Sequence, residues 1–243
     1  QINALIQNGH IEQAEKKLSK IIAENPKDTT HRVLLTNLIS KQSGREKEII
    51  VLLKEIEKLN PEKLQTYLFI TVHFLQLKNY EQALAAAQKT EQLFPQFSTG
   101  KLLQAKVYLA ENKFDQAISS YQQAYQQLPN NKLIATIIRL RLKQNQYTEA
   151  LDFLKKALAK QKDNNELHFL LAYVYQQQGE YGQSEIHYKE VVSKQADNIL
   201  AINNLAWVMF LQGKGAAALP LAKQAYEQAP LSAAILEDRK SVV

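Results

Sequence analysis

The sequence contains no cysteine. Disulfide bridges, thiolate metal sites and cysteine nucleophiles are therefore excluded. Glycine and proline are scarce, with seven and six among 243 residues, whereas glutamine, leucine, alanine and lysine are abundant. This composition favours helix over strand, and we expect no sheet. Long apolar runs are missing as well, since none approaches the roughly eighteen residues of a membrane-spanning helix.

Charge of either sign is present in ordinary amounts. Apolar residues make up 45% of the chain and charged residues 22%, which is typical of a folded protein. Thirty Lys and Arg against 24 Asp and Glu give a formal net charge of +6. This small excess of basic residues gives no more than a slight preference for an anionic partner.

A recurring segment organises the chain. Residues 112–129 read Asn-Lys-Phe-Asp-Gln-Ala-Ile-Ser-Ser-Tyr-Gln-Gln-Ala-Tyr-Gln-Gln-Leu-Pro, and weaker copies occur before and after them. The alanine at 117 aligns with Ala14, Ala83, Ala150, Ser184 and Ala218, and from Ala83 onward these anchors are 34, 33, 34 and 34 residues apart. A fixed period of this length is typical of a helical solenoid.

Each period is split into two helical segments by a short polar break. Apolar residues recur at helical spacing within each segment. We predict helix pairs at 1–7/11–24, 28–42/45–59, 61–77/80–93, 96–111/114–128, 131–144/147–160, 164–178/181–194 and 198–212/215–228. The corresponding repeats are 1–27, 28–61, 62–97, 98–130, 131–163, 164–198 and 199–232, with another beginning at 233, so that the solenoid occupies residues 1–237.

The pattern resembles the tetratricopeptide repeat (TPR). Its marks in one repeat are Ala105, Tyr108, Phe114, Ala117, Tyr121, Ala124 and Pro129. They recur as Ala172, Tyr175, Tyr181, Ser184 and Tyr188. The resemblance implies an all-α, right-handed superhelical solenoid of antiparallel helix pairs with about six to seven repeats. It also implies a non-enzymatic scaffold that binds a protein or peptide partner in a concave groove.

Small residues at the anchor positions are expected to let the two helices of a repeat approach closely. These anchors are Ala83, Ala117, Ala150, Ser184 and Ala218. Two departures stand out. Ile49 replaces alanine in the second repeat, which is the least regular one, and Pro220 lies inside a second helix, which it should kink or whose start it should delay.

The first helix of each repeat is expected to line the groove. Its central positions are Asn37, Val72, Lys106, Arg139, Tyr173 and Trp207, and one turn earlier lie Val33, Leu68, Leu102, Ala135, Phe169 and Asn203. Lys132 and Lys143 reinforce the basic middle of the groove. We therefore expect a carboxylate or phosphate of the partner at Lys106 and Arg139, and a flat apolar or sugar face against Tyr173 and Trp207. In the alternative interpretation the charges are only solvated and Trp207 packs between repeats.

No catalytic pattern is present. The sequence has no phosphate-binding loop, no dinucleotide-binding turn, no His-Glu-x-x-His and no Gly-x-Ser-x-Gly. Among the five histidines, His168 and His187 come closest to forming a pair, and we expect both to be solvated on helix surfaces. We predict no metal, no cofactor and no enzymatic activity.

The last complete repeat has a narrower resemblance. Residues 203–207, 212–214, 222–230 and 233–236 are similar to TPR lipoproteins of bacterial PEP-CTERM/exosortase exopolysaccharide systems. That resemblance implies a periplasmic or envelope location and components of a polysaccharide system as partners.

Two other functions compete with a scaffold. The chain could be the recognition or regulatory arm of a larger enzyme, such as a glycosyltransferase. RNA binding is disfavoured because acidic residues occupy the outer faces, including Glu12, Glu15, Glu24 and several between 46 and 57. We therefore expect no nucleic-acid partner.

The two ends of the sequence lead to further expectations. The chain begins at Gln1 without methionine, and both ends lack the polar caps of a complete solenoid, so we expect an interior part of a longer array. Residues 238–243 read Asp-Arg-Lys-Ser-Val-Val, which resembles the translation of a common sequencing adapter. We interpret these six residues as read-through.

Overall fold

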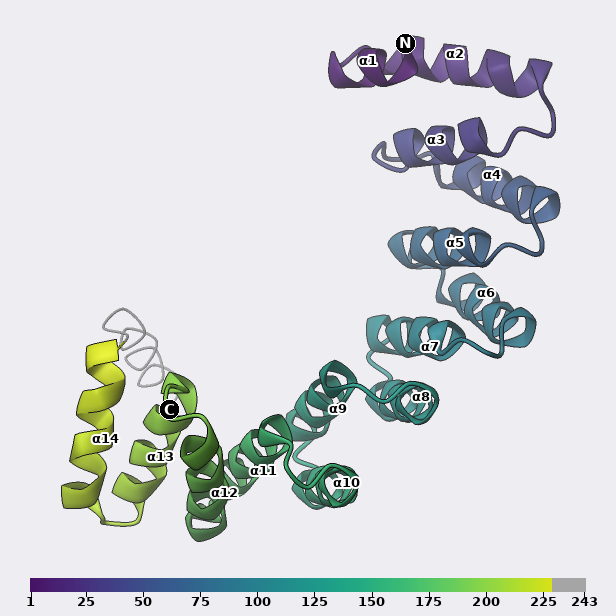
Figure 1. Cartoon of the computed structure of the whole chain (residues 1–243). Helices are drawn as coiled ribbons and strands as arrows, with labels where there is room; N and C mark the ends of the chain where they lie inside the picture. Colours follow the sequence, from purple (N-terminus) through teal and green to yellow (C-terminus); the bar gives the residue numbers. More distant parts are fainter. Residues whose placement is uncertain (229–243) are drawn as a thin grey trace. The chain divides into compact units, whose positions relative to one another are not determined.

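A computed structural model describes residues 1–228, which form fourteen α-helices and no strand (Figure 1). The helices are α1 Ile2–Gln7, α2 Ile11–Glu24, α3 Thr30–Ile39, α4 Glu46–Leu59, α5 Leu64–Gln76, α6 Tyr80–Leu93, α7 Thr99–Ala110, α8 Phe114–Gln127, α9 Asn131–Lys143, α10 Tyr147–Lys160, α11 Asn165–Gln178, α12 Tyr181–Lys194, α13 Ile199–Leu211 and α14 Gly215–Gln228. The prediction of an all-α array of helix pairs is confirmed.

The helices pack in the order of the chain within two compact units. The first unit runs from Gln1 to Leu128 and holds α1 to α8, and the second begins at Pro129 and holds α9 to α14. Within a unit each helix contacts the next, and first helices of neighbouring pairs also meet, as α5 does with α7 and α9 with α11. Helices α5 and α7 of the first unit, and α9 and α11 of the second, therefore lie side by side.

One residue with a left-handed backbone lies between the two helices of every pair. These residues are Gly9, Gly44, Lys78, Asn112, Asn145, Gly179 and Gly213, with φ between 54° and 85°. In the fourth pair the N–H of Asn112 donates to the carbonyl of Leu109 at 3.0 Å, and that of Lys113 donates to Tyr108 at 2.8 Å. These bonds satisfy the last carbonyls of α7 and reverse the chain, which produces the predicted tight turn.

The small anchor residues lie in the core. Ala83, Ala117, Ala150 and Ser184 have no exposed surface, and Ala218 has 5%. The hydroxyl of Ser184 donates to the carbonyl of Ala172 at 2.7 Å, so its polar group is satisfied inside the α11–α12 contact. Ile49 is buried at the equivalent place in the irregular second repeat, where α3 has only ten residues and a longer turn leads to α4.

Several first helices are shorter than predicted. Helix α5 begins at Leu64 instead of 61, because Pro61 and Glu62 form a turn and Lys63 has an extended backbone. Pro220 does not delay its helix, since α14 begins at Gly215 and continues through it. Pro220 is the sixth residue of α14, past the first turn, so its missing N–H removes the helical hydrogen bond to the carbonyl of Ala216. The repeat predicted from 233 and the interpretation of residues 238–243 lie outside the described residues.

Candidate functional site

The predicted groove positions all lie on first helices. Asn37, Val72 and Lys106 belong to α3, α5 and α7 of the first unit, and Arg139, Tyr173 and Trp207 belong to α9, α11 and α13 of the second. All are exposed except Tyr173, which is half-buried. The same register therefore presents a side chain to solvent in six successive pairs, while the residues beside it face the core.

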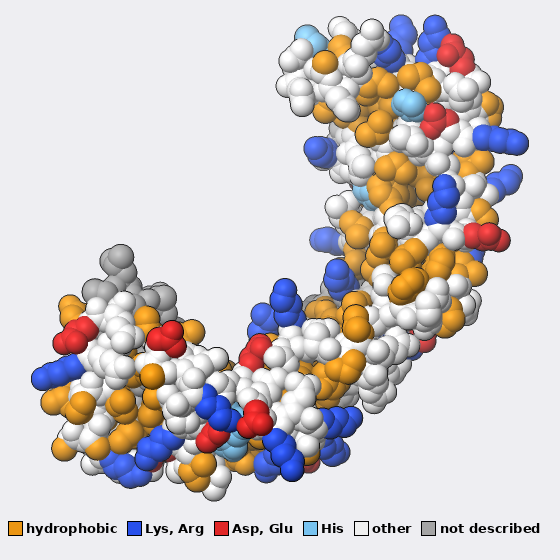
Figure 2. All heavy atoms as spheres, in the orientation of Figure 1, with side chains coloured by type: hydrophobic (Ala, Val, Ile, Leu, Met, Phe, Trp, Pro, Cys, Tyr) orange, Lys and Arg blue, Asp and Glu red, His pale blue; other side chains and the backbone are white. Residues whose placement is uncertain are grey.

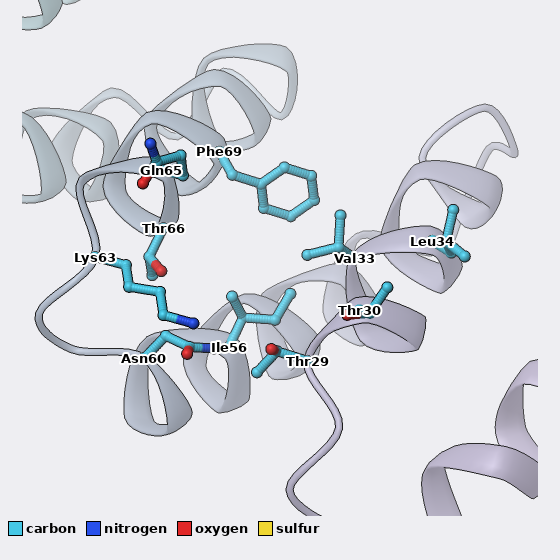
Figure 3. A pocket seen from close by; sticks show the side chains of 10 residues that line it. All are labelled: Thr29, Thr30, Val33, Leu34, Ile56, Asn60, Lys63, Gln65, Thr66 and Phe69. Carbon is cyan, nitrogen blue, oxygen red and sulfur yellow. The ribbon is translucent and has the colours of Figure 1, made fainter.

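The first unit contains an apolar pocket that opens between α3, the end of α4 and the start of α5 (Figure 3). Its volume is about 400 Å³. The lining residues are Thr29, Thr30, Val33, Leu34, Ile56, Asn60, Lys63, Gln65, Thr66 and Phe69. In Figure 2 apolar side chains gather over this part of the first unit. Lys63 is the only charged residue among the ten.

Turn residues complete this pocket, which the sequence did not predict as a site. Val33 and Phe69 come from half-buried positions of α3 and α5, but Asn60 and Lys63 belong to the connection between α4 and α5. The side chain of Lys63 extends toward Asn60 and Ile56 along one wall (Figure 3). An apolar group could bind beside a single positive charge here.

A buried histidine lies beside Asn37, one of the predicted groove residues. Nε2 of His73 lies 3.2 Å from Oδ1 of Asn37, and the ring of Phe69 meets the His73 ring edge-on at 4.3 Å between centroids. Burial lowers the pKa of His73, which therefore stays neutral at neutral pH. In the tautomer that donates to Asn37, the neutral ring fixes the amide of Asn37, a predicted groove residue.

The second unit has a basic stripe on α9, formed by Lys132, Arg139 and Lys143. Spacings of seven and four residues place all three on one helix face, and all three are exposed. Lys132 and Arg139 form no ion pair with the described residues, and neither does Lys106 of the first unit. The charges of Lys132 and Arg139 are therefore available to an anionic partner.

The predicted aromatic positions of the second unit differ in exposure. Phe169 is half-buried and packs edge-on against Tyr188, with centroids 5.5 Å apart. Trp207 is 46% exposed and stacks on Phe210, which is 58% exposed, at 5.8 Å. Asn203 is half-buried one turn before Trp207. Trp207 and Phe210 thus form a small exposed apolar patch on α13.

The expectation that His168 and His187 are solvated was wrong. Both rings are half-buried, and their Nδ1 atoms are 3.0 Å apart. Residue 168 lies near the start of α11 and residue 187 in the middle of α12, which are the two antiparallel helices of one repeat, so their packing brings the rings together. No group of three or more His, Asp or Glu suited to a metal occurs in the described part of the chain.

None of the helices in residues 1–228 has both the length and the apolar character needed to cross a membrane.

The fold and the exposed positions of the first helices define an α-helical repeat protein. Two tetratricopeptide repeat family models match the chain, at residues 72–132 and 141–208. The chain is a tetratricopeptide repeat protein, and this fold supports a protein–protein interaction scaffold. No curated protein sequence matches it.

Solved structures show the same fold. MamA is 19% identical, covering 70% of this chain and 93% of its own, with a TM-score of 0.54. YrrB, described as a TPR protein with an unusual peptide-binding site, is 17% identical over 92% of this chain and 97% of its own, with a TM-score of 0.52. A MamA fragment from Desulfovibrio magneticus RS-1 is 15% identical over 69% and 95%, with a TM-score of 0.53. At these identities the likeness concerns the fold alone.

Proposed function

We propose that this protein is a non-catalytic scaffold that binds an acidic peptide segment bearing a large apolar side chain. The observation that carries this proposal is the apolar pocket of the first unit with Lys63 at its wall. The apolar residue of the partner enters the pocket, and an adjacent Asp or Glu pairs with Lys63.

Size and lining support such an occupant. A volume of about 400 Å³ lies within the range of ligand-binding pockets and accommodates a Leu or Phe side chain. Val33, Ile56 and Phe69 offer apolar contact, and burial of a side chain of this kind contributes about 1.5–3 kcal/mol. Thr30 and Gln65 can bond the peptide backbone at the rim.

The basic surface of the first helices favours an acidic partner as well. Lys106 in the first unit and the α9 stripe in the second provide positive charge at exposed positions. Charges of this kind raise the rate of association and select for acidic sequences more than they raise affinity. The peptide-binding site described for YrrB agrees with use of the fold in this way.

Selection from a displayed peptide library tests the proposal. We expect the selected peptides to share a large apolar residue next to Asp or Glu. Val33→Asp should abolish their binding, because it places a carboxylate in the apolar pocket. Lys63→Glu should weaken it about tenfold, since it replaces one attractive charge contact with a repulsive one.

A matched control has the same change in net charge. Lys54 is exposed on α4 and does not line the pocket, so Lys54→Glu should leave binding nearly unchanged. If Lys63→Glu and Lys54→Glu weakened peptide binding equally, the effect would come from the change in net charge and not from a contact with Lys63. Unaltered binding by Val33→Asp would exclude the pocket.

For the cellular setting we propose a bacterial envelope, with components of a polysaccharide system as partners. The support is the sequence of the last complete repeat at 203–207, 212–214 and 222–230; residues 233–236 of the same resemblance lie outside the described part. Extending the gene sequence in both directions tests this. A lipoprotein signal upstream would support it, whereas an appended catalytic domain would make the chain the recognition arm of an enzyme such as a glycosyltransferase.

A further inference from the structure

Two histidines of the second unit face each other with their ring nitrogens. His168 on α11 and His187 on α12 have their Nδ1 atoms 3.0 Å apart, with ring centroids at 5.2 Å. Both rings are half-buried, so the site is supported by packing and remains open to solvent on one side. The repeat holds the two rings on neighbouring antiparallel helices, which restricts their separation.

A backbone carbonyl defines the tautomer of one ring. Nε2 of His168 lies 3.3 Å from the carbonyl oxygen of Lys162, and only a protonated Nε2 can donate to it. Nδ1 of His168 is then an unprotonated acceptor, which receives the Nδ1 proton of His187. Metal-binding histidines have the same arrangement: one ring nitrogen binds the metal, and the N–H of the other donates a hydrogen bond to a group such as a backbone carbonyl.

We propose that His168 and His187 bind a late first-row transition metal ion, Cu²⁺ or Ni²⁺, through their two Nδ1 atoms. The two nitrogens are 3.0 Å apart. With an ion 2.0–2.1 Å from each of them, the nitrogen–metal–nitrogen angle would be about 94°. That angle fits two adjacent corners of a square-planar or octahedral site better than two corners of a tetrahedron. Rotation of the rings about Cβ–Cγ directs both lone pairs to the ion, and water completes the coordination. The Nδ1 proton of His187 moves through solvent to Nε2 of the same ring, so the imidazole stays neutral.

The surroundings of the second ring favour its neutral form. Burial lowers the pKa of His187, and the neighbouring His168 and Lys155 lower it further, whereas Glu190 acts in the opposite direction. The ring also lies parallel to the Tyr175 ring, with centroids 5.8 Å apart. His187 is therefore neutral, as a metal ligand must be.

The surrounding charges are mixed. Lys155 lies 5.7 Å above the Tyr175 ring, and its positive charge opposes binding of a cation. Glu190 follows His187 by one turn and pairs with Lys194 at 2.9 Å, and Lys194 also reaches Asp163 at 3.2 Å. Because Lys194 pairs with both carboxylates, the two imidazoles are the proposed ligands. Affinity then follows the general order of divalent metals, in which Cu²⁺ binds most tightly and Ni²⁺ next.

Calorimetric titration of the tag-free chain with CuCl₂ and NiCl₂ at pH 7.5 tests the site. We expect one ion per chain, and electron paramagnetic resonance of the Cu²⁺ form should show two nitrogen donors. His168→Ala and His187→Ala should each weaken binding by more than about tenfold. Loss of a residue that only supports a metal ligand already weakens binding by about tenfold or more, and these two residues are the ligands themselves. Lys155→Gln should strengthen binding, because it removes the opposing charge.

His10 provides the control, since it is exposed on the first unit and His10→Ala should leave the affinity unchanged. Circular dichroism establishes that each variant keeps its helices. The electron paramagnetic resonance spectrum of the parent protein tests the two nitrogen donors directly, even if a variant fails to fold. A Cu²⁺ spectrum without two nitrogen donors would overturn the proposal. Equal affinities of the parent and the His168→Ala/His187→Ala double variant would overturn it as well.

Discussion

Gly100→Ala is expected to destabilise the first unit, with a loss of about 1–3 kcal/mol in the free energy of unfolding. Gly100 is buried near the start of α7, where the chain passes close to the last turn of α6. A Cβ at this position would lie 2.6 Å from both the Cα and the backbone nitrogen of Glu91. These backbone atoms cannot move aside alone, so the two helices would have to separate.

The direction of this effect is the reverse of the usual one. Replacing glycine by alanine inside a helix normally adds about 0.8–1.0 kcal/mol of helix propensity. Gly182 supplies the matched control, because it lies in α12 and the place that a Cβ would occupy there has no neighbouring atom within 4 Å. Gly182→Ala should therefore stabilise the protein by about 0.4–1 kcal/mol. Urea unfolding followed by helical circular dichroism measures both.

Opposite signs for the two variants would establish that the α6–α7 contact requires the absence of a side chain at 100. If Gly100→Ala were as stable as Gly182→Ala, the backbones would not meet at this point. Glu91 also bonds Lys101 at 2.7 Å and Gln104 at 2.7 Å across the same contact, so a separation of the helices should weaken these bonds too.

The helices could be predicted because each one repeats the same local pattern. An apolar stripe at helical spacing and a polar break recur about every 34 residues in seven copies, and six of these copies also carry a small anchor. The left-handed residues of the turns follow this period too, although glycine, asparagine and lysine share the position, so residue type alone does not reveal it. Gly100 was not singled out, because a glycine in a helix does not show how close the next backbone lies.

The site could be predicted only in part, and the reason is geometric. Helical periodicity decides which residues one helix exposes, so exposed positions such as Lys106 and Arg139 can be found from the sequence. The pocket depends instead on how the turn with Lys63 folds back against α3. The periodicity of apolar residues in the sequence does not determine the path of that turn. The contact of His168 with His187 likewise depends on the rotation of two helices about their axes, and 19 residues separate the two rings.

The last prediction concerns Glu185, a buried carboxylate that joins α12 to the turn before α14. Its oxygens accept bonds from Lys189 at 2.6 Å, Lys214 at 2.6 Å and Gln212 at 2.8 Å, and the residue is only 6% exposed. Glu185→Ala should lower the free energy of unfolding at neutral pH by about 1–3 kcal/mol, because it leaves these donors without their shared acceptor. Thermal unfolding at constant ionic strength measures the loss.

Two substitutions separate lost packing from lost charge. The equivalent residues of the preceding repeats are Leu151 and Ile118, both buried. Glu185→Leu should therefore recover only the part of the Glu185→Ala loss that comes from packing, because the three donors still lack their acceptor. Glu190 on the same helix pairs with Lys194 at an exposed position, and Glu190→Ala should cause a much smaller loss. Equal losses in Glu185→Ala and Glu190→Ala would contradict a structural role for the buried carboxylate.

The stability of the parent should also depend on pH through Glu185. Hydrogen bonds from Lys189, and then from Lys214 and Gln212, lower the pKa of Glu185 from its ordinary 4.5 to about 2. The folded state therefore binds this proton less readily than the unfolded state, and the contribution to stability is complete above pH 4.5 and disappears as the pH falls toward 2. Glu185→Leu cannot titrate, so between these limits its stability should fall less steeply than that of the parent. Parallel curves for the two proteins would show that Glu185 does not hold its charge through these bonds.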